Sequence, residues 1–90
     1  MSRVLNECGE VAAEVFAKPG FVLAVPLQID SLLVAQRFQQ AVTSSLRASG
    51  RRAVLMDARR GAVNSPEVNE SMWNWASKTP HFDVLAILNS

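Results

Sequence analysis

The stretch Val54-Leu-Met-Asp-Ala-Arg-Arg60 leads directly into Gly61-Ala-Val-Asn-Ser-Pro-Glu-Val68, and together they decide the fold. A short apolar run ends in Asp57, and a loop then reaches a Ser-Pro-Glu sequence that is typical of a helix start. Parallel-sheet domains repeat this arrangement of buried strand, loop and helix, and their binding sites usually lie at such junctions. The stretch predicts an α/β fold, although it contains no recognisable set of catalytic residues.

The composition fits a single globular domain over residues 1–90. Apolar residues make up 49% of the chain, which is enough to form a core in a domain of this size. The formal net charge of +1 gives no bulk attraction to nucleic acid or to an anionic membrane. Two arginine pairs, Arg51-Arg52 and Arg59-Arg60, lie about 20 Å apart at about 3.3 Å per residue and do not form one patch. We therefore expect no nucleic-acid partner.

The cysteine content and the absence of long apolar runs indicate the compartment. Cys8 is the only cysteine, so no disulfide can form within the chain and a reducing environment is favoured. The N-terminal sequence has no apolar core of signal-peptide length, and no run approaches membrane-spanning length. We expect a cytoplasmic protein that does not insert into membranes.

Two apolar runs around Pro19-Gly20 predict a β-hairpin. The first run covers Glu10–Ala17, where a short helix is the alternative because alanine and glutamate favour helices. The second run covers Phe21–Leu27. Pro26 has no amide hydrogen, so we expect it at a strand end or at a sheet edge.

An amphipathic helix is predicted over Ser31–Ser49. Asp30 is expected to cap its N-terminus, with Ile29 and Val34 as a hydrophobic staple, and Gly50 is expected to end it. The three- and four-residue spacing that predicts the helix joins Leu33, Val34, Phe38, Ala41, Val42, Ser45 and Leu46.

The second half of the chain predicts strand, helix and strand. Ala53–Asp57 is short and unbroken in apolarity, as a strand buried on both faces is. Ser65 is expected to cap a helix over Pro66–Lys78, and Phe82–Leu88 is expected to form another buried strand. The predicted order is β-β-α-β-α-β, which gives a mixed, mostly parallel sheet with one antiparallel hairpin, two main helices and two right-handed crossovers.

This order resembles the STAS superfamily of sulfate-transporter and anti-sigma-factor-antagonist domains, especially its lipid-pocket-like relatives. The resemblance is carried by the Pro19-Gly20 hairpin, the helix start Gln28-Ile-Asp-Ser, the strand end Leu55-Met-Asp57-Ala and the strand Phe82-Asp-Val-Leu-Ala-Ile. It implies a non-enzymatic domain that acts through protein contacts in regulation or assembly. The lipid-pocket-like relatives imply the alternative, a carrier of a small apolar ligand.

The chain departs from that family in two places. Family members usually continue with another helix, and often a strand, beyond the position of Phe82–Leu88, whereas this sequence stops at Ser90. We therefore expect a C-terminally short domain whose exposed face is covered by a protein partner or by a second copy in a homodimer. Regulatory members also carry an Asp-Ser-Ser/Thr-Gly type phosphorylation loop, and here the corresponding residues are Asn64-Ser65-Pro66-Glu67.

Ser65 is the candidate phosphoacceptor, since a helix N-terminus favours a phosphoryl group. Pro66 removes a donor amide, however, and Glu67 adds like charge. We therefore expect Ser65 to be a plain N-cap.

Asp57, Arg59 and Arg60 form a candidate loop site at the carboxyl end of a predicted strand. A lone carboxylate without a histidine or second acid beside it does not make an acid–base or metal site. We expect Asp57 to bind backbone amides of the following loop or to pair with Arg59.

The tryptophans suggest an interface. On the helix Pro66–Lys78, Trp75 shares a face with Val68 and Met72, whereas Trp73 lies roughly 140° from Val68 at 100° per residue. Trp73 is expected either to be exposed in a protein interface, where tryptophan is enriched, or to pack against a loop or its own helix. Phe82 is the second candidate interface residue.

We therefore predict an interaction module that is not an enzyme and that requires no cofactor or metal. A closed core between sheet and helices would favour this module, and an apolar cavity there would favour the carrier.

Overall fold

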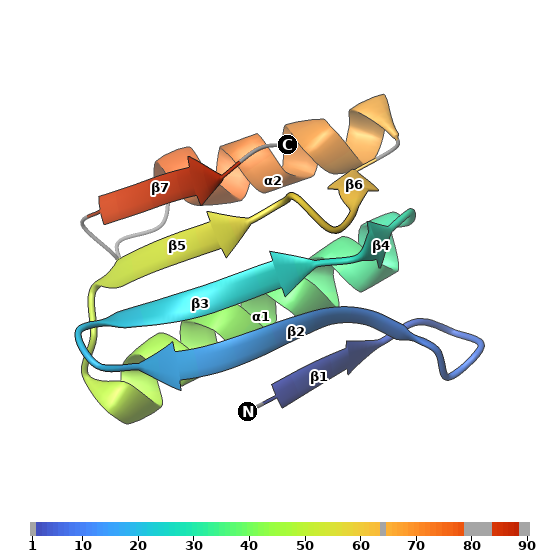
Figure 1. Ribbon diagram of the computed structural model, residues 1–90. Helices are drawn as coiled ribbons and strands as arrows, with labels where there is room; N and C mark the ends of the chain where they lie inside the picture. Colours follow the sequence, from blue (N-terminus) through green and yellow to red (C-terminus); the bar gives the residue numbers. More distant parts are fainter. Residues whose placement is uncertain (1, 64, 79–83, 89–90) are drawn as a thin grey trace.

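The computed structural model describes residues 2–63, 65–78 and 84–88. It is an α/β fold in which a mixed five-stranded sheet carries two helices on one face (Figure 1). The sheet order is β1-β2-β3-β5-β7, and two short strands, β4 and β6, form a separate parallel pair. The elements are β1 (Ser2–Leu5), β2 (Val11–Lys18), β3 (Phe21–Pro26), β4 (Gln28–Ile29), α1 (Leu32–Ser49), β5 (Ala53–Asp57), β6 (Ala62–Val63), α2 (Pro66–Lys78) and β7 (Val84–Leu88).

The predicted hairpin is confirmed, and the helical alternative for Glu10–Ala17 is wrong. β2 and β3 are antiparallel and close at the pair Lys18↔Phe21. Gly20 has φ +84°, a value that residues with a Cβ rarely adopt. Pro26 is the last residue of β3 and occupies a position that donates no bond to β2, since the next bond to that strand runs from the Leu27 amide to the Ala12 carbonyl at 2.9 Å.

The sequence reading missed β1. Four residues pair antiparallel with β2, so the sheet has two antiparallel pairs rather than one. Only Val4 of this strand is buried, which leaves no alternating apolar pattern to detect. The connecting turn is organised by Asn6, whose Oδ1 accepts hydrogen bonds from the amides of Cys8 and Glu10 at 2.9 Å each. Cys8 therefore lies exposed in an ordered turn.

The predicted strands Ala53–Asp57 and Phe82–Leu88 are parallel neighbours in one sheet wherever the chain is described. β5 pairs with β3 and with β7, parallel in both cases, and the last strand begins at Val84. Phe82 lies outside the described residues. The helix Pro66–Lys78 has the predicted bounds.

The first helix begins one residue later than expected. Its N-cap is Ser31, whose Oγ accepts a hydrogen bond from the Val34 amide at 3.2 Å, and the predicted cap Asp30 is exposed and lies outside the helix. Both residues are good N-caps, so the sequence alone does not choose between them. Gly50 ends the helix with φ 69°, as expected.

The core lies between one face of the sheet and the two helices. α1 contributes Phe38 at its centre, with no exposed surface, and Val42 beside it. Val68 and Met72 bring the buried face of α2 to the same cluster. Leucine- and phenylalanine-sized side chains each contribute about 1.5–3 kcal/mol when they are fully buried, so this one-sided core accounts for the main stabilising term.

The short β4–β6 pair joins the loop after β5 to the segment just before α1 by strand pairing. Gln28 and Ile29 pair with Ala62 and Val63. Gly61 passes so close to the Leu27 backbone that a Cβ there would overlap the Leu27 carbonyl. Glycine is therefore required by close approach at this position.

We expect Gly61→Ala to lower the free energy of unfolding by about 1–3 kcal/mol, since two backbones must separate to admit the methyl group. Urea denaturation measures this loss. Gly9→Asn is the matched control, because Gly9 has open space around it and asparagine tolerates its positive φ. Equal stability of Gly61→Ala and the wild type would contradict the packing at Leu27.

Candidate functional site

An apolar row crosses the sheet on the side away from the helices. Paired residues of neighbouring strands point to the same face, so the pairs Phe16↔Leu23, Leu23↔Leu55 and Leu55↔Ala86 place four side chains in one line. Phe16, Leu23 and Leu55 are half-buried and Ala86 is exposed. Val22, the neighbour of Leu23 along β3, points to the helices and has no exposed surface.

This side of the sheet has no second layer. Both helices lie behind the sheet in Figure 1, against the opposite face. In the described part of the chain, no helix or strand lies over the row. We call the surface formed by Phe16, Leu23, Leu55 and Ala86 the open sheet face.

Charged residues lie at one margin of the open sheet face. Arg3 and Glu14 pair across β1 and β2, with 3.8 Å between Arg3 Nε and Glu14 Oε2. Lys18 Nζ lies 5.3 Å from the centroid of the Phe16 ring. Such exposed contacts contribute about 1 kcal/mol or less each to the stability of the fold. Their main effect is to hold these charged side chains in place along the edge of the apolar row. The open sheet face therefore has an apolar centre with charged residues along its β1–β2 margin.

Asp57 lies at the carboxyl end of β5, where the sequence placed a candidate loop site. Its carboxylate accepts two hydrogen bonds from the Arg59 guanidinium, Nε to Oδ1 and Nη2 to Oδ2, both at 2.9 Å. The Arg59 amide also donates to Oδ1 at 3.1 Å. The expected pairing with Arg59 and with the loop backbone is therefore present. Arg60 is exposed beside it.

These contacts lower the pKa of the Asp57 carboxyl group. The side-chain hydrogen bonds from Arg59, followed by the bond from its backbone amide, lower the pKa of Asp57 from 3.8 to about 2. A carboxylate that is ionised and bound in this way is a poor general acid or base at neutral pH. Asp57 and Arg59 thus support the loop between β5 and β6.

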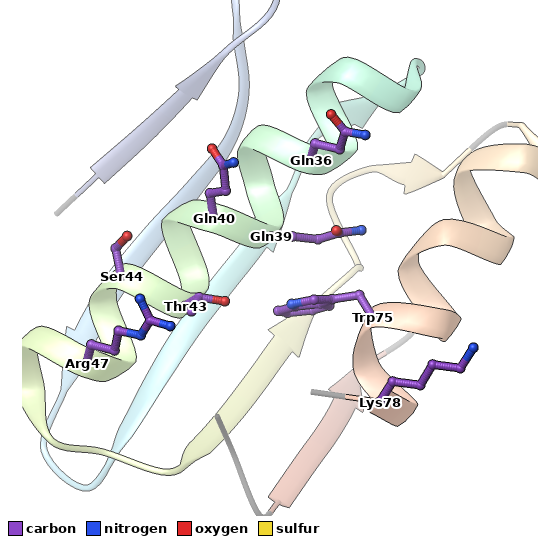
Figure 2. A pocket seen from close by; sticks show the side chains of 8 residues that line it. All are labelled: Gln36, Gln39, Gln40, Thr43, Ser44, Arg47, Trp75 and Lys78. Carbon is purple, nitrogen blue, oxygen red and sulfur yellow. The ribbon is translucent and has the colours of Figure 1, made fainter. Parts of the chain in front are cut away.

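A groove separates the outer surfaces of the two helices (Figure 2). It has a volume of about 540 Å³. Gln39 spans it and donates from Nε2 to Ser71 Oγ at 3.2 Å, and Trp75 points from α2 toward α1. It is lined by Gln36, Gln39, Gln40, Thr43, Ser44, Arg47, Trp75 and Lys78, and polar and apolar atoms contribute about equally to its walls. This groove lies outside the core, whereas an apolar carrier requires an apolar gap between sheet and helices.

The other candidate residues are dispersed. Trp73 is 56% exposed, which favours the expected exposed position of its ring over packing against a loop or its own helix. The Ser65 carbonyl accepts the Asn69 amide at 2.9 Å, so Ser65 occupies the N-cap position of α2. Phe82 lies outside the described residues. The structure therefore does not bring these residues together with Asp57 in one site.

The sequence reading missed the open sheet face. It took the apolar run Ala53–Asp57 as a strand buried on both faces, and this is wrong because Leu55 is only half-buried on the uncovered side. The unbroken apolarity of this strand does not distinguish an uncovered apolar face from burial on both faces. A continuous apolar strand has apolar side chains on both faces of the sheet. It does not show whether elements of the same chain cover both faces.

Comparisons with protein-family models, with curated protein sequences and with solved structures gave no match for this chain. Its resemblance to STAS domains therefore stays a prediction. Neither helix of the described chain is long and apolar enough to cross a membrane. Within the same residues, no three histidine, cysteine or acidic side chains form a group that could hold a metal ion.

The ion pair at Asp57 predicts a pH-dependent contribution to stability. The pKa of Asp57 in the folded protein is about 2, below its ordinary value of 3.8, so the ionised form favours folding. The stabilisation should be complete above about pH 4 and should be lost as the pH falls toward 2. We expect Asp57→Asn to be less stable than the wild type at pH 7 and to approach it in acid.

Urea denaturation between pH 2 and pH 7 measures this convergence. Asp30→Asn is the matched control, because it removes the same charge from an exposed aspartate just before α1. A stability deficit of Asp57→Asn that stays constant over the whole pH range would contradict the ion-pair account.

Proposed function

We propose that this chain is a small, non-enzymatic protein-interaction module of STAS-like type, acting in regulation or assembly in the cytoplasm. One observation carries the proposal: the open sheet face is apolar across four strands and has no covering layer in the described chain. A partner that supplies this layer would complete the two-sided burial that such sheets normally have.

The energetics of the row support a protein as the ligand. Full burial of a leucine or phenylalanine side chain contributes about 1.5–3 kcal/mol, and Phe16, Leu23 and Leu55 are each already half-buried. A second layer packed about 10 Å from the sheet would bury the remainder. The flat shape of a sheet suits a helix or another sheet better than a small molecule, which binds in concave pockets.

The alternative function, carriage of a small apolar ligand or lipid, has less support. The space between the sheet and the helices is filled by buried side chains, with Phe38 and Met72 among them. The groove between α1 and α2 opens on the outer surface of the helices, outside that core. Both observations favour the interaction module.

A photo-crosslinking amino acid at Leu55 tests this function. We expect it to form a discrete covalent adduct with a protein when cells that contain the chain are irradiated, because Leu55 lies at the centre of the open sheet face. The mass of the adduct distinguishes a second copy from another protein.

Gln36 provides the matched control, since it is exposed on α1 on the other side of the molecule. The same amino acid there should give no discrete adduct. An equal pattern of adducts from both positions would contradict the proposal. A co-purified small apolar molecule in native mass spectrometry, with no protein adduct, would support the carrier instead.

A further inference from the structure

The two edges of the sheet differ in how they are protected. At the β1 edge, Arg3 supplies a charge, the register shifts between Val4 and Leu5, and Arg37 Nη1 donates to the Leu5 carbonyl at 2.9 Å. Charges, irregular register and covered carbonyl groups are the usual devices that prevent an edge strand from pairing with another chain. This edge is therefore closed to a further strand.

The β7 edge carries none of these devices in the described chain. Its sequence Val84-Leu-Ala-Ile-Leu88 has no charge, and its register with β5 is regular over all five residues. Ile87 and Leu88 are each 38% exposed. An uncharged, regular and apolar edge strand is a template for strand pairing.

The direction of the free backbone groups follows from one hydrogen bond. The Ala58 amide donates to the Leu88 carbonyl at 2.9 Å, so the polar backbone groups of Leu88 point toward β5. Because this direction alternates along a strand, the N–H and C=O groups of Leu85 and Ile87 point to the open edge. These two residues lie symmetrically on either side of Ala86, the midpoint of β7.

We propose that β7 pairs antiparallel with β7 of a second copy, with the two-fold axis at Ala86. In this register Leu85 of each copy exchanges hydrogen bonds with Ile87 of the other, and Ala86 faces its own counterpart as a non-hydrogen-bonded pair. All five residues of the strand then overlap, and two five-stranded sheets become one continuous sheet. This inference rests on the proposed function and names a second copy as a partner.

The neighbouring surface of α2 fits the same partner. Ser71 faces α1, where its Oγ accepts from Gln39, and Trp73 lies about 200° further around the helix, on the side away from α1. α1 packs against β1, β2 and β3, whereas β7 is the opposite edge of the sheet, so the side of α2 away from α1, which carries Trp73, is the side of the open edge. Ala76 and Ser77 lie near Trp73 on the helix and are uncharged, whereas Glu70 lies about 60° from Trp73 on the other flank.

A two-fold axis brings residues that lie close to it near their own copies, so like charges close to the axis would repel each other. Of the charged residues of α2, Glu70 lies nearest to Trp73, and it points away from the sheet rather than toward β7. A stable dimer buries about 800 Å² on each partner, more than one five-residue strand supplies. The contact therefore has to extend to Trp73, and we expect a dissociation constant in the micromolar range (on the order of 1–100 µM).

Cysteine crosslinking tests the register. In a Cys8→Ser background, Ala86→Cys should form a disulfide-linked dimer, because a non-hydrogen-bonded pair has Cα atoms about 4.5 Å apart, within the range of a disulfide. Ile87→Cys is the matched control: its own copy lies diagonally, roughly 7–8 Å away, and it should crosslink far less. Non-reducing electrophoresis at tens of micromolar protein (the range of the expected affinity) measures both yields.

Sedimentation of Ile87→Pro tests the edge itself. The proline removes a donor that points to the open edge and no bond to β5, so we expect loss of the dimer with a native circular dichroism spectrum. If this variant does not fold, Ile87→Lys places a charge at the same edge and should also yield a monomer.

A wild-type protein that stays monomeric up to about 100 µM would overturn the inference. So would equal crosslinking of Ala86→Cys and Ile87→Cys. A dimer that crosslinks through Leu55→Cys and not through Ala86→Cys would place the second copy on the open sheet face. That result would reject edge pairing and leave the proposed function intact.

Discussion

Both helices of this protein cover the same face of the sheet, and the exposed surfaces follow from that constraint. β3 connects to β5 through α1, and β5 connects to β7 through α2, so the parallel strands are added in one direction. Right-handed crossovers that progress in one direction place their helices on one side. A second covering layer would require the chain to reverse direction or to add another element. The open sheet face is therefore a consequence of connectivity.

The antiparallel half of the sheet enlarges the uncovered area. The hairpin at Pro19-Gly20 adds β2 to β3, and β1 extends the sheet further without adding a helix. The β1 edge is protected by Arg3 and a register shift, whereas β7 has neither. Two kinds of unsatisfied surface thus remain: the apolar row that ends at Ala86 and the backbone groups at the β7 edge. Both reach the same end of the sheet, and edge pairing of β7 would join the two apolar rows at Ala86 into one longer row.

Local chemistry made much of this fold predictable from the sequence. The Pro19-Gly20 turn, the glycine at Gly50 and the Ser65-Pro66 helix start each fix backbone geometry over a few residues, and the elements they bound were predicted closely. The pairing of Asp57 with Arg59 was predictable for the same reason, because Arg59 follows Asp57 by two positions at a strand end. Turns, helix caps and ion pairs between residues that are close in sequence can be predicted from the residue types alone.

The remaining features depend on tertiary context. β1 has a single buried residue and forms only because β2 offers it an edge. Asp30 and Ser31 are equally good caps by residue type, so residue type does not decide which of them caps the helix. The open sheet face could not be predicted, because the apolarity of Leu55 does not show which layer covers it. The exposure of Trp73 was undecided for the same reason.

The most direct test of the account compares two adjacent residues of β3. Glutamate at Leu23 should leave the purified protein folded, with a urea midpoint near that of the wild type, because this side chain lies on the open sheet face. Glutamate at Val22 should abolish folding, because it buries a charge beneath the helices. Circular dichroism during urea denaturation of both variants gives the answer. Comparable destabilisation by the two substitutions would show that both faces of the sheet are covered, and it would contradict the central claim.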